Sequence, residues 1–575
     1  MMKSVWGVLF ALAVLWLAAL VQRGAPLAAD ELEFFRATKW IAEGRVPYRD
    51  FWEHHTPLQW FAFAPVAALF ATGPGVAAIV AMRWAQVMLW LALYALLIRF
   101  VRRIDVNAWP ALVLLLASAT FARRAVEYRL DVLGNLGFVA ALVLVAFGAT
   151  RARWIAFGAL MSAAVLANMR LAPLVVFTAA LALFWRGDER RWRWNGRALW
   201  MAVGVAGVAG TFVAYLLITH AWTPFIDALV GYTAASGQLL EVHTYFDALL
   251  MPVWTLDAGG IAFWIAALLG IGFTMRERGA LQFTAVVAIA SVAAVAVPDV
   301  QYDYHFQTSW LLLLPFAAVT VARWRAVFAI VAAGALAIFV MQVVPAFGVE
   351  MQYQDDVMTA VDRLTEPHER VFDGGGFALR REPAYRYWFL TTGVRMLVQT
   401  GVYERYEIAH DPPAALVCDY RLRVFLDAFP ELAQYATTHY VPLYRNLWVP
   451  GLTARVGPHP TRVAWIAPRA GHYDVHASAA LATHPWLTQP LAYAETVGPV
   501  APQYAIPLRR LPPLAATALQ WRVDGVAQPA NARTLTLRKG SRVELFASPD
   551  AAAGVLLVPR GIEALALAPA EPFVF

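Results

Sequence analysis

The sequence predicts a polytopic α-helical membrane protein that carries a C-terminal extracytoplasmic region of α/β and β-sandwich type. Its 575 residues are 60% hydrophobic and only 15% charged, whereas a soluble domain is roughly 45–50% apolar and about 25% charged. A helix that spans a bilayer needs about 20 mostly apolar residues, and about eleven stretches satisfy this rule. They lie at 5–22, 77–99, 106–122, 131–149, 154–169, 171–186, 198–219, 256–274, 280–297, 308–322 and 326–346.

Basic residues between the apolar stretches predict the orientation of the chain. Cytoplasmic loops are enriched in lysine and arginine, and with the N-terminus inside, each basic cluster lies on the cytoplasmic side. The clusters are Lys3; Arg99, Arg102 and Arg103; Arg151 and Arg153; Arg186, Arg190, Arg191, Arg193 and Arg197; Arg276 and Arg278; and Arg323 and Arg325. An odd number of spans then places the tail in the periplasm of a bacterium whose inner membrane holds the protein. A signal peptide cleaved near Ala28-Ala29 is the alternative interpretation of the first stretch.

We expect three parts along the chain: a membrane module at 1–346 with a first external loop at 23–76, an α/β segment at 347–450, and a β-sandwich-like domain at 451–575. In the first loop, Glu31–Ala42 has apolar residues at helical spacing, and Asp30 is expected to be the N-cap. In the last part, turn residues such as Asp524-Gly525 and Lys539-Gly540 separate stretches with strand-like patterns. The expected strands are Arg462–Ile466, Tyr473–Ala477, Ala518–Val523, Thr534–Leu537 and Arg542–Phe546.

Charge and cysteine content exclude several classes of function. The formal net charge is +7, but the basic residues lie in short topology-determining clusters rather than in one patch, so no nucleic-acid partner is expected. Cys418 is the single cysteine. It can therefore form neither an intramolecular disulfide nor a metal site based on several cysteines.

Three polar clusters are expected on the external side of the membrane. The first loop contains Asp30-Glu31, Tyr48, Asp50 and Glu53-His54-His55; a second set is Arg123, Arg124, Glu127, Arg129 and Asp131, with Arg170 in a nearby turn; and the turn 298–306 holds Tyr304 and His305. Arginines on this side oppose the positive-inside bias, which favours a role in holding an anionic group. Ionisable residues this close to a bilayer usually face a cavity or a partner, so we expect the clusters to converge.

The order of these motifs resembles the GT-C glycosyltransferases. Asp-Glu at 30–31 is followed by Gly-x-x-Pro-Tyr-x-Asp at 44–50, by His-x-Pro-Leu at 55–58, by Arg83, by Arg129-Leu130-Asp131 and by a Tyr-His-Phe turn at 304–306 before a leucine-rich stretch. The nearest resemblance is to the branch that contains the protein O-mannosyltransferases, the aminoarabinose transferase of lipid A and the rhizobial lipopolysaccharide galacturonosyltransferases. It covers roughly 1–345, whereas the tail resembles no family that we can name.

The resemblance implies a GT-C-like fold and an inverting transfer of sugar from a polyprenyl-phosphate donor to an acceptor hydroxyl on the external face. The catalytic residues that it implies are Asp30, as the base, with Asp131 and Glu31. An anionic leaving group needs positively charged contacts. The expected contacts of the donor phosphate are Arg129, Arg170, His55 and His305. The expected contacts of the substrates are Tyr48, Asp50, His54 and Tyr304.

The expected partners are a polyprenyl-phosphate-linked sugar, a glycan, lipid or protein acceptor, and membrane lipids. No cofactor or metal is expected. His54-His55 stands where the aminoarabinose transferases have Glu-Lys, however, which leaves open a metal that bridges His55, Glu53 or His305 to the phosphate. An envelope transporter is one alternative, but transporter sites lie near the bilayer midplane and between repeats. A non-catalytic membrane scaffold is another, and the intact acids Asp30 and Asp131 argue against it.

Overall fold

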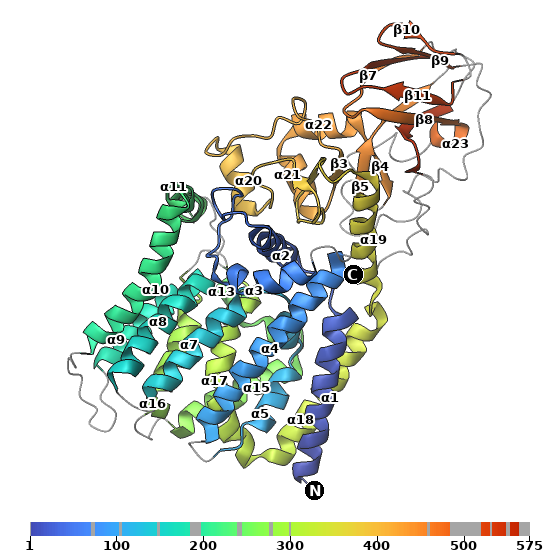
Figure 1. Ribbon diagram of the computed structural model, residues 1–575. Helices are drawn as coiled ribbons and strands as arrows, with labels where there is room; N and C mark the ends of the chain where they lie inside the picture. Colours follow the sequence, from blue (N-terminus) through green and yellow to red (C-terminus); the bar gives the residue numbers. More distant parts are fainter. Residues whose placement is uncertain are drawn as a thin grey trace. The chain divides into compact units, whose positions relative to one another are not determined.

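The computed structural model describes residues 2–70, 75–102, 106–146, 150–184, 197–237, 244–274, 280–297, 301–444, 446–456, 461–482, 519–529, 532–547 and 553–562. The chain divides into two compact units, Met1–Met351 and Gln352–Phe575. Figure 1 colours the elements of both units along the sequence. The first unit consists of helices, and the second combines helices with three β-sheets.

The apolar stretches of the first unit form helices that pack around a common apolar core. The α-helices are α1 Met2–Ala19, α2 Ala29–Ala42, α3 Leu58–Leu69, α4 Gly75–Arg102, α5 Trp109–Leu116, α6 Ala119–Val126, α7 Asp131–Ala146, α8 Arg151–Ala167, α9 Ala172–Phe184, α10 Ala198–Ile218, α11 Trp222–Phe225, α12 Tyr232–Gly237, α13 Tyr245–Leu249, α14 Met251–Trp254, α15 Ala258–Thr274, α16 Ala280–Ala294, α17 Gln307–Arg323 and α18 Arg325–Val343. Shorter helical turns are η1 Leu20–Gly24, η2 Met169–Leu171, η4 Ile226–Gly231, η5 Asp303–Phe306 and η6 Val344–Ala346. In α17, Leu311 and Leu314 are fully enclosed, so this helix lies inside the unit.

Among the described residues, five helical segments are long and apolar enough to cross a membrane, and the pair α5–α6 would make six. The five are Ser4–Gly24, Gly75–Arg102, Ala198–Ile218, Asp303–Arg323 and Arg325–Val343. Further apolar helices, such as Ala258–Thr274, have between 10 and 17 residues. At 1.5 Å per residue, a 17-residue helix is about 25 Å long, less than the hydrocarbon core of about 30 Å. The expected number of about eleven spans therefore stays a prediction.

The stretch 106–122, which we expected to form one continuous span, is broken in the structure. α5 ends at Leu116, α6 begins at Ala119, and the two are bent by 84°. At the break, the Ser118 hydroxyl accepts a hydrogen bond from the Phe121 N–H (3.2 Å) and donates one to Oδ2 of Asp257 (2.6 Å). Oδ2 of Asp257 also accepts a hydrogen bond from the Thr120 N–H (3.0 Å). The buried Asp257 therefore satisfies polar groups that a continuous helix would have paired internally.

Helix α2 begins at Ala29 rather than Glu31, and its N-cap is Ala28 rather than the expected Asp30. Alanine has no side-chain acceptor, and the Glu31 carboxylate instead accepts a hydrogen bond from the Ala28 N–H (3.0 Å), which is one half of a capping box. Asp30 consequently lies within the first helical turn, where the helix dipole favours a carboxylate.

The second unit starts with a mixed five-stranded sheet. Its elements are α19 Val349–Leu364, which begins in the first unit, β1 Arg370–Asp373, β2 Glu382–Pro383, α20 Thr392–Gln399, β3 Ala415–Val417, α21 Tyr420–Ala428, α22 Pro430–His439, β4 Tyr440–Tyr444 and β5 Leu447–Pro450. The strand order is β2-β1-β3-β5-β4. β1 pairs in parallel with β2 and β3, whereas β5 is antiparallel to β3 and β4. Asp419 follows β3 and caps α21 by accepting from the Leu422 N–H (2.8 Å).

Two four-stranded sheets follow, with the orders β10-β9-β12-β7 and β11-β8-β13-β6. Their elements are β6 Leu452–Val456, β7 Thr461–Ile466, β8 Gly471–Ser478, α23 Ala479–Ala482, β9 Leu519–Val523, β10 Val526–Ala527, β11 Thr534–Leu537, β12 Arg542–Ala547 and β13 Ala553–Pro559. Side chains of both sheets, including Trp521 and Leu535, share one core, so the sheets form a sandwich. β7, β8, β9, β11 and β12 coincide with the expected strands, although Ala518 lies outside the described residues. Asp524 and Gly525 have φ values of 51° and 81°, which suits the tight turn between β9 and β10.

Candidate functional site

Buried charges of the first unit gather around α2, at the end of the helices away from the N-terminus of α1 (Figure 1). The deepest pair joins Glu31 on α2 to Arg83 on α4, and both side chains are 0% exposed. Arg83 donates from Nε to Oε1 (2.7 Å) and from Nη2 to Oε2 (2.5 Å). Its remaining donors reach the carbonyl oxygens of Ala25 (2.9 Å) and Pro26 (2.8 Å). Glu31, one of the expected catalytic acids, is thus enclosed in a network that fixes the start of α2.

The loop before α7 is held to α3 and α4 through its backbone. Gln86 on α4 donates to the Glu127 carbonyl and accepts from the Arg129 N–H (2.9 Å). Gln59 on α3 donates to the Arg129 carbonyl (2.5 Å), and Glu31 accepts from the Tyr128 N–H (2.7 Å). Because the backbone is pinned on three consecutive residues, the direction of the Arg129 side chain is fixed.

Arg129 joins the three polar clusters that the sequence predicts. Its Nη1 contacts Asp30 Oδ2 (3.1 Å) and Glu127 Oε2 (3.2 Å), and its Nε contacts Asp131 Oδ2 (3.2 Å). The guanidinium carbon lies 3.6 Å from the centre of the Tyr304 ring, as expected for a cation–π contact. Only 3% of the Arg129 side chain is exposed, compared with 24% of Asp30. Arg129 therefore neutralises acids of this chain, and Asp30 is the more accessible partner.

Asp131 and Arg170 are linked through the turn that precedes α9. Asn168 donates from Nδ2 to Asp131 Oδ1 (2.8 Å) and accepts from the Arg170 N–H (3.1 Å). Arg170 is exposed, and its guanidinium carbon lies 5.8 Å from the centre of the Tyr304 ring. Arg170 thus lies on the same aromatic ring as Arg129 but is open to the outside.

His305 lies beside this ring, 4.5 Å from Tyr304 between ring centres. Its Nδ1 accepts from the Tyr302 N–H (3.2 Å), and its buried Nε2 has no hydrogen-bond partner among the described residues. Asp303 accepts from Nε of Arg124 (3.0 Å), which connects this turn to α6. The first part of the expected cluster, 298–300, lies outside the described residues.

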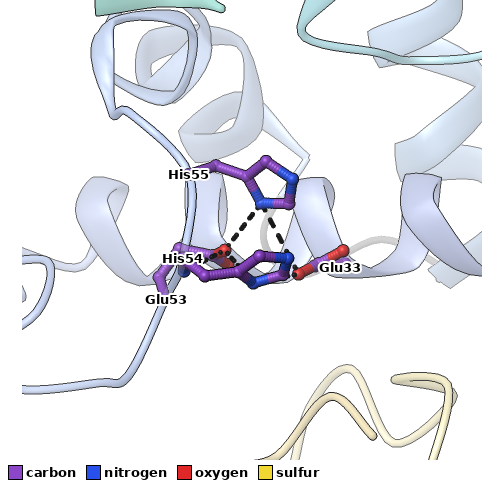
Figure 2. A group of neighbouring side chains, drawn as sticks. All are labelled: Glu33, Glu53, His54 and His55. Atoms are coloured by element: carbon purple, nitrogen blue, oxygen red, sulfur yellow. Dashed lines mark hydrogen bonds and ion pairs between the residues drawn. The ribbon is translucent and has the colours of Figure 1, made fainter. Parts of the chain in front are cut away.

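A second polar group lies in the loop between α2 and α3 and on the face of α2. It consists of Glu33, Glu53, His54 and His55, here termed the two-His two-Glu cluster, in which one ligand atom from each residue lies within 4.8 Å of the others. Figure 2 shows both imidazole rings beside the two carboxylates. Nδ1 of His55 lies 2.9 Å from Glu53 Oε1 and 3.8 Å from Glu33 Oε1. For Nδ1 of His54 the same distances are 3.3 and 3.6 Å.

Burial and neighbouring groups set the protonation of this cluster. Burial alone raises the pKa of Glu53, but contacts with His54 and His55 outweigh it and lower this pKa to about 2. Burial lowers the pKa of His55 to about 4, and the charges of His54 and Arg170 act in the same direction. Glu53 is therefore ionised and His55 neutral at neutral pH, so His55 brings no positive charge of its own to a donor phosphate. Burial also raises the pKa of Glu127, against the opposing charges of Arg124 and Arg129.

Two of the expected substrate contacts have local partners instead. Asp50 binds Arg49 (2.7 and 2.9 Å) and the Val46 N–H (2.7 Å) within its own exposed turn. The buried Tyr48 has a φ of 69°, which is unusual for a residue other than glycine, and its hydroxyl donates to the His55 carbonyl (2.6 Å). Tyr48 therefore orients the loop that carries His55.

Sequence reasoning missed Gln59, Gln86 and Glu33 as parts of the site. A signal for Gln86 was available, because a polar amide within an apolar helix usually has a buried partner. Glu33 lies one turn beyond Asp30 on α2, which placed it on the same helix face. Its closeness to His54 and His55 depends on the path of the loop, which the spacing does not give.

No model of a known protein family matches the sequence, and no curated protein matches it. The fold matches two solved structures of ArnT from Cupriavidus metallidurans, one bound to undecaprenyl phosphate and one in the apo state. For the first, the TM-score is 0.53 at 15% identity, covering 77% of this chain and 97% of ArnT. For the second, it is 0.51 at 16% identity, covering 78% and 98%. ArnT is an aminoarabinose transferase of the GT-C class, and the likeness confirms for this chain the GT-C-like fold that its motifs predicted.

Proposed function

We propose that this chain is an inverting glycosyltransferase that moves a sugar from a polyprenyl-phosphate donor to an acceptor hydroxyl. The fold supports a lipid-linked donor, because an ArnT structure of the same fold holds undecaprenyl phosphate. The observation that carries the proposal is the environment of Asp30. This acid keeps 24% of its side chain exposed beside Arg129, while the neighbouring Glu127 and Asp131 keep only 9% and 11%.

In the proposed reaction, the Asp30 carboxylate accepts the proton of the acceptor hydroxyl. The hydroxyl oxygen forms a bond to the anomeric carbon of the sugar, while the bond from that carbon to the phosphate oxygen breaks. The electron pair of the broken bond stays on the polyprenyl phosphate, whose growing negative charge requires a cation. A base must be ionised and reach the hydroxyl, and a neighbouring guanidinium favours the ionised carboxylate.

We assign the contact with the donor phosphate to Arg170 rather than to Arg129. Arg129 is nearly enclosed and already contacts three carboxylates, whereas Arg170 is exposed above Tyr304. A guanidinium suits phosphate because it donates two parallel hydrogen bonds. In this proposal Arg129 positions Asp30 and Asp131, and Glu31 acts through Arg83 as a structural residue.

We further propose that the transfer takes place at the periplasmic face of the bacterial inner membrane, with the N-terminus in the cytoplasm. The basic clusters between the apolar stretches support this orientation. The same orientation places Gln352–Phe575 in the periplasm, where a glycan, lipid or protein acceptor is available.

The test uses the full chain in detergent with a panel of radiolabelled polyprenyl-phosphate sugars and envelope extract as the source of acceptor. Wild type is expected to transfer label from one of these donors, and Asp30→Asn is expected to lose the transfer. Asp227→Asn, which changes an exposed carboxylate in η4, is the matched control and should keep the transfer. If folded wild type turned over none of the donors, or if Asp30→Asn kept the activity, the proposal would be wrong.

A further inference from the structure

We propose that Glu33, Glu53, His54 and His55 form a binding site for one divalent transition-metal ion of the Zn²⁺ class. The inference goes beyond the proposed transfer and does not depend on it. Two imidazole nitrogens and two carboxylate oxygens are ligands that Zn²⁺ accepts in four-coordinate sites. The sequence left a metal at Glu53 and His55 open, but it did not predict Glu33 as a ligand, because Glu33 comes from α2 and the other three residues from the following loop.

The distances within the cluster suit a tetrahedral ion. Zn²⁺ binds such ligands at about 2.0–2.1 Å, so neighbouring ligand atoms of a tetrahedron lie about 3.3–3.4 Å apart. The four distances between the histidine Nδ1 atoms and the two Oε1 atoms are 2.9, 3.3, 3.6 and 3.8 Å. Each of these four distances lies within about 0.5 Å of that spacing, and one ligand atom from each of the four residues lies within 4.8 Å of the others.

A buried acceptor in the cluster points to a ligand independently of these distances. Glu53 is 0% exposed, and its Oε1 is shared by the His54 N–H (2.8 Å) and His55 Nδ1 (2.9 Å). Its second oxygen, Oε2, accepts no hydrogen bond from any described residue. A buried carboxylate oxygen without a donor is costly, and a cation held by both oxygens of the Glu53 carboxylate would remove that cost.

Aromatic side chains hold the two imidazole rings in place. The His54 ring stacks on Trp52, with ring centres 5.2 Å apart and planes at 20°, and lies 4.8 Å from Tyr232. The His55 ring meets the edge of Phe34 at 5.2 Å. Metal sites gain affinity from surroundings that orient their ligands in this way. The His54 and His55 side chains are 13% and 14% exposed, so an ion can reach them from solvent.

The first experiment uses the wild-type chain alone, so that it does not depend on a variant that folds. Full-length protein in detergent is freed of metal with a chelator and titrated with Zn²⁺, and X-ray absorption is recorded at the zinc edge. One tightly bound ion per chain with two imidazole ligands and no sulfur is expected. Binding of less than a stoichiometric amount, or a shell of water oxygens alone, would overturn the proposal.

Variants then locate the ion. The double substitution His54→Ala/His55→Ala is expected to reduce bound Zn²⁺ to background, whereas the matched double substitution His410→Ala/His472→Ala in the second unit should leave it unchanged. Retention of the ion by the first variant would contradict the site. Asp30→Asn separates this inference from the proposed function, because it should lose transfer and keep the ion. Wild type that binds Zn²⁺ at these residues but transfers no sugar would leave the site standing and remove the proposed function.

Discussion

Arg83 and Glu31 form a two-point ion pair with no exposure to solvent, and this pair connects α4 to the first turn of α2. The same turn carries Asp30, and the Glu31 carboxylate also accepts from the Tyr128 N–H. One buried pair therefore sets the positions of α2 and of the loop that leads to Arg129. Loss of this pair is therefore expected to lower the stability of the fold, and to affect catalysis only through that loss.

Removing one partner of this pair should destabilise the protein strongly. Glu31→Ala leaves the Arg83 charge buried and unpaired, which typically costs about 3–5 kcal/mol. The free energy of unfolding, measured by SDS titration in mixed micelles, should fall by that amount. Lys39→Ala removes the partly exposed pair with Glu43, the residue that caps the end of the same helix, and should cost less than about 1 kcal/mol. Equal effects of the two substitutions would show that the Arg83–Glu31 pair is not a determinant of stability.

Gln86 is expected to stabilise the loop before α7 through its backbone contacts. Gln86→Leu leaves the Glu127 carbonyl and the Arg129 N–H without their partner, and each unpaired buried group costs about 1–3 kcal/mol. The same unfolding measurement should show a loss of about 2–6 kcal/mol. Gln282→Leu is the matched control, since Oε1 of Gln282 has no hydrogen-bond partner among the described residues. A tolerated Gln86→Leu would mean that the loop is held by other contacts.

Arg170 should affect the use of the donor more than the folding of the protein. Loss of a charge-assisted hydrogen bond costs about 1.5–3 kcal/mol, so Arg170→Gln should lower kcat/KM for the polyprenyl-phosphate sugar by about 10- to 160-fold. Arg170→Lys should recover part of the loss, because it keeps the charge but not the two-point geometry. Arg45→Gln, which changes a first-loop arginine over Trp40, should have little effect. A normal kcat/KM in Arg170→Gln would exclude Arg170 from the phosphate site.

Asp419 is expected to make the second unit less stable as the pH rises. Burial, with the charge of Asp373 adding to it, raises the pKa of Asp419 to about 7, although the Leu422 N–H opposes the shift. The folded-state pKa thus lies above the usual value near 3.9. The stabilisation that protonated Asp419 contributes is therefore fully present below about pH 3.9 and is lost as the pH rises through 7. The loss reaches roughly 4 kcal/mol at most.

The measurement for Asp419 is hydrogen exchange of the amides in α21 in the full chain between pH 5 and 8, corrected for intrinsic rates. Protection in wild type should decrease with pH. In Asp419→Asn it should stay level and exceed wild type at pH 8, because asparagine caps a helix as well as aspartate. Asp427→Asn changes an exposed acid of the same helix and should behave like wild type. A pH dependence that persists in Asp419→Asn would assign it to another group.

Local patterns predicted most of the elements of the fold, because helix and strand periodicity is set by neighbouring residues. The strand β12 and the turn at Asp524-Gly525 lie where the sequence placed them. The expected meeting of the three polar clusters is also seen, since Arg129 contacts both Asp30 and Tyr304. Motif order predicted this meeting because the clusters share one side of the predicted topology.

Features that depend on distant residues escaped prediction. The bend at Ser118 needs Asp257, and the direction of Arg129 needs Gln59 and Gln86 on two other helices. Hydropathy gives no information on such partners, because it averages over a window and ignores contacts in space. The closeness of Glu33 to His54 and His55 escaped for the same reason.

The 84° bend between α5 and α6 imposes an order of events during synthesis. Ser118 leaves the ribosome 139 residues before Asp257, its partner, and chains grow at about 5–20 residues per second, so about 7–28 s pass before the partner exists. During that interval the Ser118 hydroxyl and the Thr120 N–H lack the acceptor that Asp257 later provides. The bend can therefore reach its final set of hydrogen bonds only after the chain has been made as far as Asp257.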